Sequence, residues 1–185
     1  MTIFLIFQNL WDYRISGVFV MSDEVSMGIL NKIKRFFDKI FKSGENEIVI
    51  IIDGPNTLRK IDGKRVSLKQ IIEETKKFGR VRAAKAVITT EAPPSLVKAL
   101  QTSGFEIILA KEDNAYVTLA VEAVRSIYEY EPDIIVVVSR DSRCLPIVHK
   151  IKERGIKVFV AGFQPGFSTA LQNAADKVIT LELQG

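Results

Sequence analysis

Six short apolar runs, several of them almost continuously β-branched, alternate with helical patterns along most of the chain. The runs are IVIII (48–52), VRAAKAVI (81–88), FEIILA (105–110), DIIVVV (133–138), KVFVAG (157–162) and KVITLE (177–182). Helical patterns lie between them, near residues 67–78, 94–103, 115–129, 142–154 and 168–175. Continuous β-branched runs are typical of strands buried on both faces, and strict strand–helix alternation implies right-handed crossovers. The sequence therefore predicts an α/β fold, a doubly wound parallel sheet in three αβα layers.

The scarcity of soft metal ligands narrows the chemistry. The chain has one cysteine, Cys144, and one histidine, His149. A disulfide framework and a Cys/His zinc cage are therefore excluded, and a cytoplasmic, reducing location is expected. Metal chemistry would have to rest on carboxylates, which favours Mg²⁺ or Mn²⁺. For the two residues themselves we expect a small buried filler at Cys144 and an ordinary helical residue at His149.

Residues 1–46 are interpreted as an N-terminal extension, and 47–185 as the domain. Within the extension, 27–42 repeats apolar residues at helical spacing, and 27–43 holds five basic residues against Asp38. This predicts a basic amphipathic helix that packs on the domain or on a second copy as a homodimer, or that docks on membrane or nucleic acid. Residues 1–20 are either a start-codon artefact or an extra strand. No apolar run reaches the roughly 18 residues of a membrane span, and no signal peptide is recognised.

Polar residues follow two of the predicted strands. Asp53 and Asn56 come after the first strand, and Ser139 and Asp141 come after the fourth. Ligands of such sheets collect beyond the carboxyl ends of the strands. Each acid also has a simpler explanation, because Asp53 could be a turn former and Asp141 a helix cap.

A third acid, Glu122, lies within a largely apolar helix, AYVTLAVEAV. Either it faces solvent, or it faces the edge where Asp53 and Asp141 are expected. Three converging carboxylates would repel one another unless a divalent cation neutralised them. This arrangement would suit a phosphodiesterase whose metal ion activates water.

The elements IIIDGPN, LAVEAV, VVVSRDSRCLPIV and GFQPGFSTALQNAADKVITL resemble the NYN domain, a PIN-like (LabA-like) nuclease family, and in particular an archaeal branch of it. The resemblance covers about 47–182. It implies a PIN-like fold, an RNA substrate, a Mg²⁺ or Mn²⁺ cofactor, and metal-binding or catalytic roles for Asp53, Glu122 and Asp141. Asn56 would orient water or substrate.

The chain departs from the family pattern at two places. Tyr116 stands where the family often has an acid six residues before the helical one, and Arg143 and Cys144 replace a second Asp and an aromatic residue. Arg143 could supply a missing metal charge, grip a phosphate, or mark a site that binds without cutting.

Other polar residues near the same edge are candidates for substrate binding. They are Ser139, Arg140, Arg143 and Ser168, in addition to Asn56. Ser168 has an alternative role as the N-cap of the helix that follows it.

Three functions remain open on the sequence. The leading hypothesis is a metal-dependent endoribonuclease, and the second is a catalytically degraded nucleic-acid-binding module of the same fold. The third is a nucleotide-binding or protein-interaction scaffold. The sequence has neither a G-x-G-x-x-G motif nor a P-loop, which argues against this hypothesis.

Overall fold

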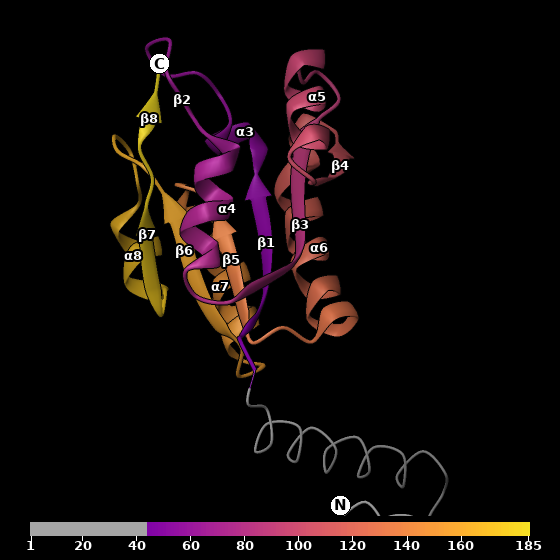
Figure 1. Cartoon of the computed structure of the whole chain (residues 1–185), viewed down its shortest axis with the longest axis vertical. Coiled ribbons are helices and arrows are strands. Elements are labelled where there is room, and N and C mark those ends of the chain that lie inside the picture. The colour runs from indigo at the N-terminus through magenta and orange to yellow at the C-terminus, as the bar shows by residue number, and fades with distance from the viewer. Residues whose placement is uncertain (1–43) are drawn as a thin grey trace, which may run out of the picture. The chain divides into compact units, whose positions relative to one another are not determined.

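The computed structural model describes residues 44–185, in which six strands form one parallel sheet in the order β4-β3-β1-β5-β6-β7 (Figure 1). The strands are β1 (Glu47–Asp53), β3 (Arg80–Thr89), β4 (Glu106–Ala110), β5 (Ile134–Val138), β6 (Lys157–Gly162) and β7 (Lys177–Thr180). Each predicted strand is present, and the predicted α/β doubly wound sheet is confirmed.

Helices cover both faces of this sheet. They are α4 (Leu68–Lys76) and α5 (Pro94–Thr102) on one face, and α6 (Ala115–Tyr130), α7 (Leu145–Lys152) and α8 (Thr169–Ala174) on the other. The two faces reflect the alternation of side chains along a strand. In β1, Ile48, Ile50 and Ile52 pack with α4 and α5, whereas Val49 and Ile51 pack with α6 and α7. The sheet is thus the middle of three layers, as predicted.

Two features at the carboxyl edge were not predicted. A four-residue helix, α3 (Gly54–Thr57), follows β1 directly. A separate two-stranded antiparallel sheet joins β2 (Arg65–Val66) to β8 (Leu183–Gln184). Strands of two residues are too short to show a period in the sequence, but Val66 is buried in the core and anchors the pair.

The winding of the sheet reverses beside β1. The chain leaves β1 for β3 and β4 on one side, then returns to β5 on the other side. The carboxyl ends of β1 and β5 are direct neighbours, with Ile52 paired to Val138. Ligands of open α/β sheets bind at such a switch point, and the residues after Ile52 and Val138 are therefore placed there.

The predicted helix over 27–42, the homodimer contact assigned to it and residues 1–20 lie outside the described residues. Glu45–Gly185 form one compact unit. Within residues 44–185, no helix is long and apolar enough to cross a membrane.

Candidate carboxylate site

Asp53, the last residue of β1, is the buried centre of the site, with 3% of its surface exposed. The Ser139 hydroxyl donates a hydrogen bond to Asp53 Oδ2 at 2.8 Å, and Asn56 Nδ2 lies 3.0 Å from Oδ2 and 3.2 Å from Oδ1. Burial raises the pKa of Asp53 despite these hydrogen bonds, and the negative charge of Asp141 raises it further. Asp53 is therefore a carboxylate that a nearby cation would stabilise.

Asp141 lies on the loop after β5 and is tied to Arg143. Its Oδ1 accepts a hydrogen bond from the Arg143 backbone N–H at 2.9 Å, and its Oδ2 lies 2.7 Å from Arg143 Nη2 and 3.0 Å from Nε. Hydrogen bonding from the Arg143 side chain holds the pKa of Asp141 at about 2. Asp141 is thus ionised, and it caps the short 3-10 turn of Ser142–Cys144, as the simpler explanation of this acid had it.

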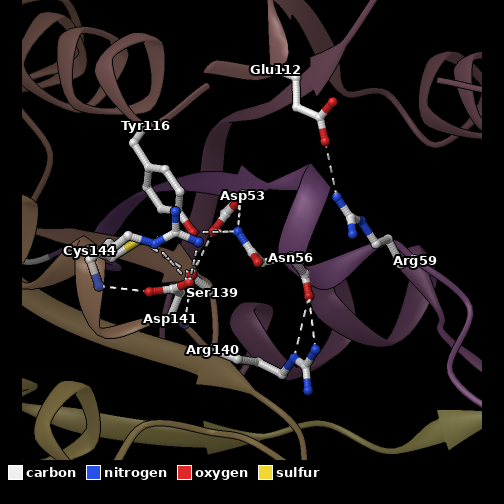
Figure 2. Close-up of polar contacts among 10 residues, drawn as sticks. Asp53, Asn56, Arg59, Glu112, Tyr116, Ser139, Arg140, Asp141 and Cys144 are labelled. Atoms are coloured by element: carbon white, nitrogen blue, oxygen red, sulfur yellow. Dashed lines mark hydrogen bonds and ion pairs between the residues drawn. The ribbon is translucent and has the colours of Figure 1, made fainter. Parts of the chain in front are cut away.

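The two departures from the family pattern, Tyr116 and Arg143, contact each other. The Arg143 guanidinium lies 4.1 Å from the centre of the Tyr116 ring. The Tyr116 hydroxyl accepts a hydrogen bond from Asn56 and interacts with Asp141 (Figure 2). Burial, followed by the charge of Asp53, raises the pKa of Tyr116. A neutral hydroxyl and a stacked cation therefore stand beside the two carboxylates.

Glu122 is not brought to this edge. It lies on α6 with 8% exposure, and its Oε2 is 3.0 Å from Nζ of Lys85, which is 1% exposed. Burial by itself lowers the pKa of Lys85, but the hydrogen bond and charge of Glu122 outweigh it and the pKa is raised. The expected convergence of three acids is therefore not found, because Glu122 faces the middle of β3. In residues 44–185 no group of three or more Asp, Glu, His or Cys residues is placed to hold a metal ion.

Arg140 and Ser168 hold the surrounding loops. Nε and Nη2 of Arg140 each lie 3.3 Å from the Asn56 carbonyl oxygen, and Nη1 donates to the Pro165 carbonyl. The Arg140 guanidinium also stacks on Phe163 at 4.3 Å. Ser168 caps α8 by accepting a hydrogen bond from the Leu171 N–H at 3.3 Å, as its simpler interpretation predicted. An open hollow of about 330 Å³ lies over these loops, lined by Asn56, Arg140, Asp141, Ser142, Gly166 and Ser168.

The burial of Cys144 was predicted from the sequence, whereas the buried ion pair of Lys85 was not. Cys144 is buried as expected, but its thiol lies 3.3 Å from the Ser139 hydroxyl, a contact that its sequence position does not reveal. Burial raises the pKa of Cys144 to about 12, so the thiol remains protonated. The pairing of Lys85 with Glu122 was not predicted. The lysine inside the apolar run VRAAKAVI was the available signal, because a buried ammonium needs an acidic partner.

The donor set at the edge fits one divalent cation of the hard type. Asp53 and Asp141 provide two carboxylates, with the Ser139 hydroxyl oxygen beside them, while the Asn56 side-chain nitrogen donates to Asp53. Mg²⁺ is commonly bound by one or two carboxylates together with water and substrate phosphate. With Glu122 elsewhere, these residues do not provide the ligands for a second ion.

The fold and this edge define a class, a nuclease-like PIN-type α/β domain with carboxylates at the switch point of its sheet. The chain belongs to the NYN domain family, whose model matches residues 47–182. It is 38% identical over 155 residues to the uncharacterized protein MJ0482 of Methanocaldococcus jannaschii, a match that covers 81% of this chain and 63% of that protein. The crystal structure of a protein of unknown function, VPA0982 from Vibrio parahaemolyticus, has the same fold, with a TM-score of 0.66 and 21% identity over 76% of this chain and 95% of that one.

Proposed function

We propose that this chain is a metal-dependent endoribonuclease whose catalytic residues are Asp53 and Asp141. The observation that carries the proposal is the proximity of these two carboxylates at the switch point of a nuclease-like fold, beside an open hollow. Asp53 and Asp141 would hold a single Mg²⁺ or Mn²⁺, which when bound activates water and stabilises the leaving oxygen.

The other residues of the site have supporting roles in this proposal. Ser139 and Asn56 orient the Asp53 carboxylate through their hydrogen bonds. Arg143 is exposed beside Asp141. In place of a second metal ion, it provides a positive charge that a substrate phosphate can contact. Arg140 donates to the carbonyl oxygens of Asn56 and Pro165 and so holds the two loops together. It could not leave these partners without separating the loops.

The test is cleavage of labelled single-stranded RNA with Mn²⁺, compared with an EDTA control and with Asp53→Asn. We expect cleavage to disappear in both, and Asp53→Asn to keep its thermal transition, because an amide of the same shape removes a buried charge. Glu45→Gln, an exposed carboxylate at the opposite end of β1, serves as the matched control and should cleave normally. Cleavage retained in Asp53→Asn would reject the assignment.

A second function, RNA binding without cleavage, is favoured by one observation. The negative charge of the ionised Asp141 is already paired with the Arg143 guanidinium through two side-chain hydrogen bonds. Calorimetric titration with Mn²⁺ distinguishes the two functions. Binding that depends on Asp53 supports the enzyme, whereas RNA binding with no Mn²⁺ binding and no cleavage supports the binding module.

A further inference from the structure

A second hollow lies on the other side of α3 from the candidate site. It has a volume of about 490 Å³ and is bordered by α4, α5 and the β2–β8 pair. Its apolar lining includes Leu58, Leu68 and Leu96. Its charged lining consists of three basic side chains, Lys60, Arg65 and Lys69, and no acidic side chain of the described residues lines it.

A third hollow, of about 400 Å³, connects this one to the carboxyl edge. The two share Leu58, Lys60, Arg65 and Leu96 in their linings. The third hollow also reaches Gly54 and Pro55, the residues that follow Asp53 directly. Asn56, from the same short helix, lines the hollow over the candidate site. These two adjoining hollows, here called the basic groove, thus end beside the candidate site.

The basic groove keeps an excess of positive charge, because Arg59, Lys60, Arg65 and Lys69 line its two hollows against two acidic side chains, Glu91 and Glu112. Among residues 44–185, the side chains of Lys60 and Arg65 make no hydrogen bond or ion pair, whereas Lys69 lies 3.5 Å from Glu73 and Arg59 lies 3.7 Å from Glu112. Residues 59–69 contain five basic residues and one aspartate, in a described chain that is otherwise near neutral. Cations gathered along one open channel attract a polyanion.

We infer that the basic groove binds the phosphodiester backbone of the single-stranded RNA on which the carboxylate edge acts. Lys60 and Arg65 contact phosphates, and the leucine-lined wall takes the flat faces of bases without selecting among them. The inference rests on the proposed function for its substrate. It adds a path by which the strand leaves the site, across α3 and between α4 and α5.

The experiment measures binding and not cleavage. Fluorescence anisotropy with a labelled 20-nucleotide oligouridylate in EDTA compares the wild-type chain with Lys60→Glu/Arg65→Glu. The matched control is Lys76→Glu/Lys157→Glu, which makes the same change of net charge at two exposed positions, the last residue of α4 and the first residue of β6. All four positions are exposed, so thermal transitions should be unchanged.

We expect the groove variant to bind at least tenfold more weakly and the control to stay within about twofold of wild type. Loss of two phosphate contacts should also reduce the slope of log affinity against log salt by about 1.4, at about 0.7 per contact with a single strand. Equal weakening in both variants, or wild-type binding by the groove variant, would overturn the inference. Failure of the proposed function is seen separately, as absent cleavage in a chain whose RNA binding still depends on Lys60 and Arg65.

Discussion

Nζ of Lys85 lies 3.0 Å from Oε2 of Glu122, and both side chains are buried between α6 and β3. Glu106 and Glu129 also approach the same ammonium, at 3.7 and 3.5 Å, from partly exposed positions. The helical acid of the family pattern therefore has a structural partner in this chain, away from the carboxylate edge.

Glu122→Gln should lower the free energy of unfolding by about 3 kcal/mol, the low end of the cost of breaking a buried ion pair, because Glu106 and Glu129 still approach the ammonium. The measurement is urea denaturation, with Glu129→Gln as the control. Glu129 is 41% exposed, so its loss should cost less than about 1 kcal/mol. RNA cleavage per folded molecule should be unchanged in both variants. Loss of cleavage at full stability in Glu122→Gln would instead make Glu122 a metal ligand.

Arg143→Ala should strengthen Mn²⁺ binding about fivefold, the effect of removing about 1 kcal/mol of repulsion between like charges in an exposed setting. Nη2 of Arg143 lies 2.7 Å from Asp141 Oδ2, so its positive charge stands where a metal ion would bind that oxygen. Calorimetric titration measures the change, and Arg143→Lys, which keeps the charge, should bind Mn²⁺ much as wild type does. Unchanged affinity in Arg143→Ala would mean that Asp141 is not a ligand.

Gly54→Ala should destabilise the domain by about 2–3 kcal/mol, the scale of an overpacked interior. A Cβ at Gly54 would lie 2.4 Å from the Val87 carbonyl oxygen and 2.8 Å from Ile88 Cγ2, so α3 would have to move off β3. Thermal unfolding checks this against Gly44→Ala, where a Cβ meets nothing within 4 Å. Equal transitions in the two variants would contradict the prediction.

Asp176→Asn should change the acid stability of the domain. Burial alone raises the pKa of Asp176, but the Lys152 ammonium at 2.9 Å and the Val158 N–H at 2.8 Å lower it below 3.8 overall. The carboxylate therefore stabilises the fold above pH 3.8, and this contribution disappears as the pH falls through the lowered pKa. Thermal unfolding between pH 6 and 3 should show the wild-type advantage shrinking toward acid pH. A constant difference over that range would be contrary to expectation.

The strands and the polar carboxyl edge of the sheet could both be predicted from the sequence. A continuous β-branched run must be buried on both faces, and the carboxyl ends of parallel strands lie together, so Asp53 and Asp141 could be placed near each other from their positions alone. The direction in which Glu122 points depends on how α6 rotates against the sheet, which a helical period does not determine. The basic groove was equally hidden, since the side on which Lys60 and Arg65 gather is set by the two-residue strands β2 and β8.

The hydrogen bond between Ser139 and Asp53 joins residues 86 positions apart. During translation, a growing chain that has released β1, β3 and β4 contains Asp53 but has not yet received Ser139, Asp141 or the loop that carries Arg143. The proposed nuclease therefore cannot assemble its site while the ribosome is still reading that part of its own messenger RNA. In the proposed function, cleavage would begin only after β5 has emerged and paired with β1, so the order of synthesis itself would delay it until the domain is nearly complete.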